Sequence, residues 1–138
     1  AKAGQQLITK FLTNMPKLKE LRENVVEASQ VGTIEALDGR LLHIRADYAS
    51  LNTLLQGAGA IICKQWLVHI TERIHKSGVD AKLVASIHDE YQFEVAKKDA
   101  KRFGQITRDA MIETQRTLKV RCPLDCEYKI GTTWSETH

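Results

Sequence analysis

The sequence lacks a long apolar run. Its 138 residues contain no stretch of about 18 uninterrupted apolar side chains, the length that a membrane-spanning helix needs. Residues 54–68 come nearest, but Gln56, Lys64 and Gln65 interrupt them. The sequence also contains no signal-peptide pattern. We therefore expect no membrane partner, and we expect residues 1–138 to form a single domain, because this length suffices to bury a core.

Cysteine is scarce, and charge of one sign is not in excess. An odd count of three cysteines, without a dense framework, favours a reducing, cytoplasmic compartment. Cys122 and Cys126 are separated by three residues, but no second ligand pair has the spacing of a zinc site, so we expect no zinc. The net charge of +3 is compatible with a nucleic-acid partner but too small to argue for one.

The hydrophobic periodicity predicts an α+β fold. Its antiparallel sheet would be accompanied by a long, central, largely buried helix and by flanking helices. We expect Asn14 and Asp47 to cap helices, Gly78 to end the long helix, and Trp134 to pack onto the body. The predicted elements are helices 2–14 and 16–28, a hairpin of 33–37 and 41–45 around Asp38-Gly39, a helix 47–77, a hairpin of 82–87 and 91–95, a helix 98–116 and a last strand 120–128.

The second hairpin carries an unusual tip. His88, Asp89 and Glu90 stand in a row between two apolar runs. We expect Asp89-Glu90 to form the turn, which then lacks the glycine that two-residue hairpin turns favour. A position where local chemistry disagrees with the fold is a candidate functional site. The alternative is an ordinary solvated turn.

The long helix contains small residues and a polar row. Gly57 and Gly59 each cost about 1 kcal/mol relative to alanine in a helix interior, and they allow a backbone or a ligand to approach closely. Asn52, Gln56 and Lys64 follow at spacings of four and eight, on roughly one face. The alternative is a helix packed closely on a strand, with polar residues at its rim.

Four segments, in this order, resemble a known family. They are Leu37-Asp38-Gly39-Arg40, the run from Asn52 through Gln56-Gly57-Ala58-Gly59-Ala60 to Lys64, Ile87-His88-Asp89-Glu90 with Gln92, and the ending from Gly131 through Trp134 to His138. Together they resemble the C-terminal part of a family A DNA polymerase, with the third signature, motif C, at the hairpin tip. The long helix is most similar to the phage branch.

The resemblance implies a role for each candidate residue. Asp89 would bind Mg²⁺, Glu90 would be the neighbouring carboxylate, and His88 would contact the primer terminus. Hard oxygen ligands suit Mg²⁺. Asn52 and Gln56 would donate to minor-groove acceptors, which every base pair presents. Arg40 and Lys64 would contact backbone phosphates, although for both the alternative is a plain surface charge.

Two family signatures are missing. The sequence has no Asp-x-Ser-x-x-Glu pattern, which would carry the second metal-binding aspartate, and no Arg-x-x-x-Lys helix leading to Tyr-Gly. Tyr48 also stands where bacterial members carry arginine. Motifs A and B are therefore expected in a missing polymerase half, with primer-template DNA and dNTP as partners of the complete enzyme. The chain alone should be inactive and bind Mg²⁺ weakly.

Two further functions stay open. The chain could be a remnant that binds duplex DNA through Asn52, Gln56 and basic side chains without catalysis. It could also be a structural fragment whose uncovered surfaces associate into a homo-oligomer, because unpaired sheet edges and apolar patches favour association.

Overall fold

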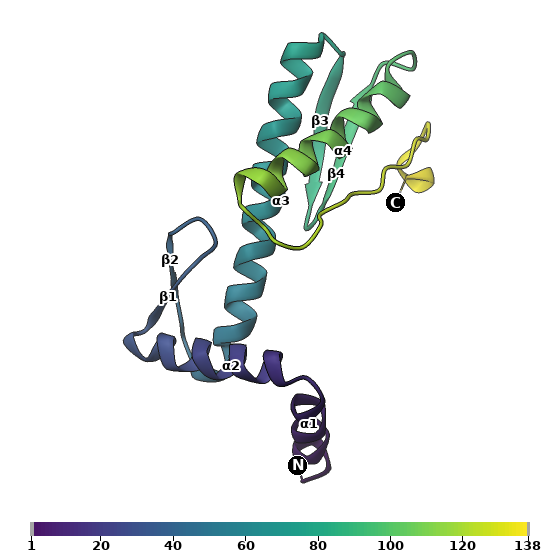
Figure 1. Ribbon diagram of the computed structural model, residues 1–138. Helices are drawn as coiled ribbons and strands as arrows, with labels where there is room; N and C mark the ends of the chain where they lie inside the picture. Colours follow the sequence, from purple (N-terminus) through teal and green to yellow (C-terminus); the bar gives the residue numbers. More distant parts are fainter. Residues whose placement is uncertain (1, 138) are drawn as a thin grey trace. The chain divides into compact units, whose positions relative to one another are not determined.

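The computed structural model describes residues 2–137, which form four α-helices and two β-hairpins (Figure 1). The α+β class predicted from the sequence is confirmed. In chain order the elements are α1 (Lys2–Asn14), α2 (Pro16–Ala28), a 3₁₀ turn Ser29–Val31, β1 (Thr33–Glu35), β2 (Leu41–His43), a 3₁₀ turn Asp47–Ala49, α3 (Ser50–Ser77), β3 (Ala81–Ile87), β4 (Glu90–Val95), α4 (Ala100–Thr117) and a 3₁₀ turn Trp134–Glu136.

The chain divides into two compact units, residues 1–58 and 59–138, and the boundary falls within α3. Each unit has its own sheet, which consists of one antiparallel pair of strands. Within residues 2–137, no helix combines the length and the apolar character needed to cross a membrane. That all 138 residues act as one domain stays a prediction.

The first unit packs the β1–β2 hairpin against α2 and the start of α3. Its core contains Val25, Ile34 and Ile44. Asp38-Gly39 turns the chain as predicted, with Gly39 at φ 84°, a left-handed conformation that glycine adopts without strain. Gly57 packs closely against β2: a Cβ there would lie 2.7 Å from Cδ1 of Leu42, so the Leu42 side chain would have to shift. The close approach expected at this glycine is thus made by a side chain of β2.

The second unit surrounds a core shared by α3, the β3–β4 hairpin and α4, which lie together in Figure 1. The indole N–H of Trp66 donates to the carbonyl of Thr107 across 2.8 Å, which joins α3 to α4. Phe103, Ala110 and Met111 are buried, as predicted for the inner face of α4. The core is composed of Trp66, Ile70, Val79, Phe103, Ala110 and Met111.

The predicted last strand, 120–128, is wrong. This segment is irregular and pairs with no strand among the described residues. Side chains hold it to α4 instead: the Arg108 guanidinium lies 2.9 Å from the Asp125 carboxylate, and the Leu124 N–H donates to the Gln115 side chain. Side-chain anchors replace a backbone ladder here, so the apolar pattern that predicted a strand reflects packing on the helix.

Two predicted caps are also corrected. Met15, not Asn14, occupies the N-cap of α2, and no side chain there bonds to the helix start. Asp47 belongs to a 3₁₀ turn, and α3 begins three residues later at Ser50, whose hydroxyl donates to the Asp47 carbonyl. Pro16 and Gly78 do mark helix ends, because proline fits the first helical position and Gly78 has φ 66°.

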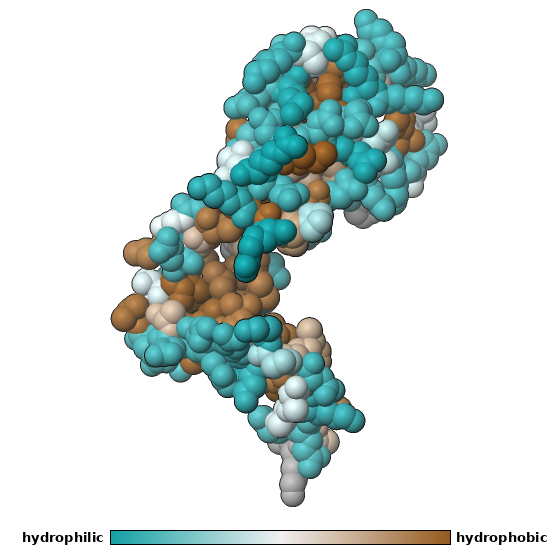
Figure 2. All heavy atoms as spheres, in the orientation of Figure 1, coloured by the Kyte–Doolittle hydropathy of each residue, from teal (hydrophilic) through white to brown (hydrophobic). Residues whose placement is uncertain are grey.

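Apolar side chains remain exposed in both units. Val68 on α3 is 48% exposed and Trp134 is 54% exposed, so α3 is less buried than predicted and Trp134 packs onto the body with only part of its surface. Brown, apolar surface is visible over the β1–β2 hairpin and the start of α3 in Figure 2, where Leu41 and Leu55 are exposed. The predicted homo-oligomer stays a prediction.

Gly104 of α4 provides a stringent test of this packing. A Cβ at Gly104 would lie 2.3 Å from the ring of Tyr128, whereas a Cβ at Gly59 would meet nothing within 4 Å. Gly104→Ala should therefore lower the free energy of unfolding by about 1–3 kcal/mol. Gly59→Ala, the matched control in a helix, should raise it by up to about 1 kcal/mol. Urea denaturation measures both, and equal effects would contradict the packing of Tyr128 on α4.

Candidate functional site

The predicted site residues His88, Asp89 and Glu90 share one hairpin, but the turn differs from the prediction. Ile87 and Glu90 form the last pair of the ladder, so His88 and Asp89 are the two turn residues and Glu90 belongs to β4. His88 has φ 54°, a left-handed conformation that costs an L-residue roughly 1–2 kcal/mol. The turn therefore carries the conformational strain that was predicted for it, and the strained residue is His88.

Aromatic packing anchors the hairpin below its tip. Tyr91 contacts Trp66 of α3 with ring centroids 5.2 Å apart, and Phe93 contacts Phe103 of α4 at 4.8 Å. A bulge between Leu83 and Ala85 leaves Val84 unpaired in β3. Glu90 and Gln92 alternate with Tyr91 and Phe93 along β4, and all four residues line one cavity.

The tip places its charges at the surface, next to a thiol. His88 and Asp89 are exposed, and Glu90 is half-buried. Cys63 of α3 lies close enough to be affected: its burial raises the pKa of the Cys63 thiol, and the negative charge of Asp89 raises that pKa further. Burial likewise raises the pKa of Tyr91, and the charge of Cys63 adds to this shift.

The donor set fits part of a magnesium site. Asp89 and Glu90 offer the hard carboxylate oxygens that Mg²⁺ prefers, and Mg²⁺ commonly takes only one or two carboxylates from a protein. Among residues 2–137 no group of three or more His, Cys, Asp or Glu side chains is arranged to hold a metal ion. Further ligands would therefore have to come from water, from a substrate phosphate or from another segment.

The predicted DNA-contacting residues of α3 are exposed. Asn52 and Gln56 lie four residues apart, on one face of the part of α3 that belongs to the first unit. Lys64, in the second unit, is exposed as well. Open space faces Gly59, whereas Leu42 fills the space beside Gly57. Close packing on a strand, one of the two sequence hypotheses, therefore holds at Gly57, whereas the approach of a ligand at Gly59 stays a prediction.

Arg40 is less available than the sequence suggested. Its Nε donates to both carboxylate oxygens of Asp38, at 3.0 and 2.8 Å. The side-chain hydrogen bond from Arg40 is also the main reason why the pKa of Asp38 is lowered. A phosphate at this turn would have to compete with the Asp38 carboxylate.

Comparison with known proteins decides the family. Residues 1–136 match the family model described as DNA polymerase family A. The chain belongs to DNA polymerase family A. It is 38% identical to the DNA-directed DNA polymerase of Enterobacteria phage T3 and 36% identical to that of Escherichia phage T7, in each case over 98% of this chain and 22% of the relative. The DNA polymerase I of Geobacillus stearothermophilus is 26% identical over 96% of the chain.

A solved structure agrees on the fold. The polymerase domain of Pol1 from M. smegmatis, in complex with DNA primer-template and dNTP, superposes with a TM-score of 0.74 at 21% identity, over 82% of this chain and 22% of that chain. The predicted family, including its likeness to phage polymerases, is confirmed. The chain spans about a fifth of the length of the phage relatives. The activity of a whole polymerase is therefore proposed for this chain below.

Two residues near the site of this family A chain were missed from the sequence. Cys63 is near enough for the charge of Asp89 to raise its pKa, and Thr137 is hydrogen-bonded to Gln92, which in turn donates to Glu90. Gln92 was singled out with the motif C segment, but without a role. No local pattern could have revealed Thr137, because 45 residues separate it from Gln92.

The turn geometry predicts opposite effects of glycine at adjacent positions. His88→Gly should raise the free energy of unfolding by roughly 0.5–1 kcal/mol, because relief of the left-handed strain exceeds the entropy cost of glycine. Asp89 has no positive φ. Asp89→Gly should therefore lower the free energy of unfolding by about 0.5–1 kcal/mol. Thermal denaturation compares them, and destabilisation by His88→Gly would contradict the observed turn.

The effect of the Asp89 charge on the Cys63 thiol can be tested by alkylation. Asp89→Asn removes a negative charge that raises the pKa of Cys63, so more thiolate should form and iodoacetamide should modify Cys63 faster at pH 8. Mass spectrometry of the Cys63 peptide measures the rate, with Cys122 as internal reference. Glu94→Gln, an exposed carboxylate of β4, serves as control. Equal Cys63 rates in the wild type and Asp89→Asn would place Asp89 away from Cys63.

Proposed function

We propose that this chain contributes the motif C part of a DNA-directed DNA polymerase active site, and that it is inactive alone. The observation that supports this most is a hairpin tip that exposes one carboxylate, half-buries a second and holds His88 in a strained conformation. Strain of this kind persists where the surrounding structure imposes it, which is common at functional sites. Membership of DNA polymerase family A adds the reaction class.

Each tip residue has a proposed role. Asp89 would bind Mg²⁺, and Glu90 would keep a second carboxylate beside it. His88, exposed at the turn, would contact the primer terminus. When bound, paired Mg²⁺ ions stabilise the attacking and leaving oxygens of nucleotidyl transfer. The protein would hold these side chains on a hairpin whose strand β4 is packed against Trp66 and Phe103.

The DNA grip would come from α3. The amides of Asn52 and Gln56 can donate to N3 of purines and O2 of pyrimidines, the minor-groove acceptors shared by all base pairs. Lys64 would contact a phosphate. Arg40 would contact one only after releasing the Asp38 carboxylate. This arrangement suits a protein that must hold DNA of any sequence. The partners would be primer-template DNA, dNTP and the remaining part of a polymerase chain.

Primer extension tests the catalytic proposal. The isolated chain should extend no primer with dNTPs and Mg²⁺. A chimera, the phage T7 polymerase with its matching stretch replaced by residues 1–138, should extend primers. In that chimera Asp89→Asn should slow extension roughly 10³-fold, since metal stabilisation supplies several kcal/mol. Glu94→Gln, on the same strand, should have no effect. Templated synthesis by the isolated chain, or full activity of Asp89→Asn, would contradict the proposal.

Binding of duplex DNA without catalysis is a second candidate function, favoured by the exposure of Asn52, Gln56 and Lys64. In a gel-shift titration of the isolated chain, Gln56→Ala should weaken binding with little change in its salt dependence. Lys64→Ala should reduce the slope against salt by about 1, because one phosphate contact is lost. Gln5→Ala, at an exposed position of α1, is the matched control. No binding at low salt would remove this candidate.

A further inference from the structure

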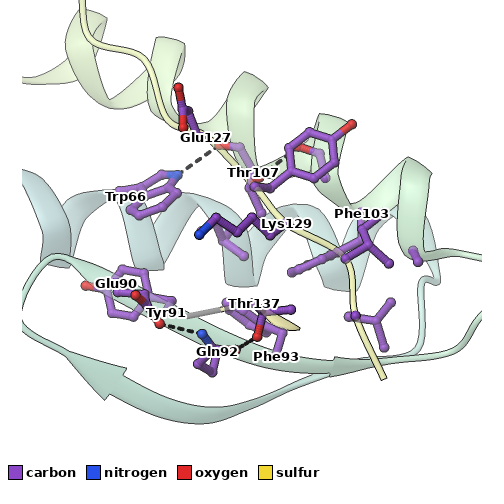
Figure 3. A pocket seen from close by; sticks show the side chains of 17 residues that line it. Trp66, Glu90, Tyr91, Gln92, Phe93, Phe103, Thr107, Glu127, Lys129 and Thr137 are labelled. Atoms are coloured by element: carbon purple, nitrogen blue, oxygen red, sulfur yellow. Dashed lines mark hydrogen bonds between the residues drawn. The ribbon is translucent and has the colours of Figure 1, made fainter. Parts of the chain in front are cut away.

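A chain of two hydrogen bonds links the candidate carboxylates to the C-terminal turn. The side-chain amide of Gln92 donates to Oε1 of Glu90, and Oε1 of Gln92 accepts from the hydroxyl of Thr137 across 3.2 Å. Both bonds are drawn in Figure 3, where Glu90, Gln92 and Thr137 follow one another along the edge of the pocket. All three residues line this 290 Å³ cavity.

The direction of these bonds follows from the groups themselves. An ionised carboxylate only accepts hydrogen bonds, so the NH₂ group of Gln92 must face Glu90. The carbonyl oxygen of Gln92 then faces Thr137, whose hydroxyl can donate to it. The same hydroxyl lies 3.1 Å from the carbonyl of Trp134, so it shares one proton between two acceptors. Gln92 is therefore held at both ends of its amide.

The turn that carries Thr137 is itself organised. The Glu136 carboxylate accepts hydrogen bonds from the backbone N–H and the hydroxyl of Thr132, and these bonds lower the pKa of Glu136. Gly131 allows this closure, because a Cβ there would lie 2.6 Å from Cβ of Glu136. Thr137 thus reaches Gln92 from a folded turn.

We propose that Gln92 is a positioning residue, which orients the Glu90 carboxylate beside Asp89, and that Thr137 positions Gln92 in turn. This inference rests on the proposed function, in which the two tip carboxylates act together. Half-buried side chains on one face of a strand can adopt several rotamers, and a donor fixed from outside the hairpin selects one of them. The turn that carries Thr137 thereby acts on the active site through Gln92.

The first test needs only the isolated chain. Three-bond couplings measured by NMR report the side-chain rotamer of Glu90. Gln92→Met keeps the size of the side chain but removes the donor, and Thr137→Val removes the hydroxyl, so both should shift Glu90 to averaged couplings. Thr137→Ser keeps the hydroxyl and should leave them unchanged. Gln105→Met, which removes an equivalent bond to Asp109 on α4, is the matched control and should leave Glu90 unchanged.

The second test uses the polymerase chimera. Gln92→Met should lower kcat about 10–100-fold, the range typical of partners that orient groups at a metal site. KM for dNTP and the Kd for DNA should stay unchanged. Thr137→Val should also lower kcat, whereas Thr137→Ser should keep the wild-type kcat. Unchanged Glu90 couplings in Gln92→Met, or equal effects of Thr137→Val and Thr137→Ser, would overturn the positioning role. An inactive wild-type chimera would instead count against the proposed function, and the couplings would still decide the role of Gln92.

Discussion

Two aromatic contacts hold the β3–β4 hairpin in place, and the arrangement of the site depends on them. Tyr91 packs on Trp66 and Phe93 on Phe103, so alternate residues of β4 are fixed to α3 and to α4. Aromatic pairs of this kind contribute about 0.5–1.5 kcal/mol each beyond the area that they bury. Glu90 and Gln92 alternate with these aromatic residues along the same strand, so the contacts that fix the backbone of β4 also fix the positions from which Glu90 and Gln92 extend.

The core also explains why a strained turn can persist. A left-handed histidine costs energy that a free hairpin would avoid by changing its turn. Here Tyr91 and Phe93 fix the register of the hairpin from Ile87–Glu90 onwards. The chain then has only His88 and Asp89 with which to reverse direction. The strain is local, and the packing that imposes it lies on another part of the same strand.

The sequence predicted the helices, both hairpins and the candidate tip because these features have short-range signals. Helical spacing located α1, α2 and α4, and Asp38-Gly39 located the first turn. The tip was misplaced by one residue because register depends on pairing across the hairpin. The prediction of a strand at 120–128 was wrong because this segment packs on α4. Arg108 and Gln115 of α4 bond to it, and its Tyr128 ring lies against Gly104. Nothing local distinguishes the apolar pattern of this segment from that of a strand.

The missed residues show the same limit. Cys63 and Thr137 lie far from the tip in sequence, so only tertiary structure brings them near Asp89 and Gln92. The closeness of Arg40 to Asp38 is local, but an ion pair at a turn can be seen only once side-chain positions are known. Spacing predicted which residues could act, and packing decides which of them are held in position.

The central claim is that Asp89, at the hairpin tip, binds a divalent metal ion. Titrating the isolated chain with Mn²⁺, and following the broadening of backbone amide signals by NMR, tests it most directly. We predict that the signals of His88, Asp89 and Glu90 broaden first, with weak affinity, and that Asp89→Asn abolishes this effect. Broadening that begins elsewhere in the chain, or that persists in Asp89→Asn, would contradict the claim.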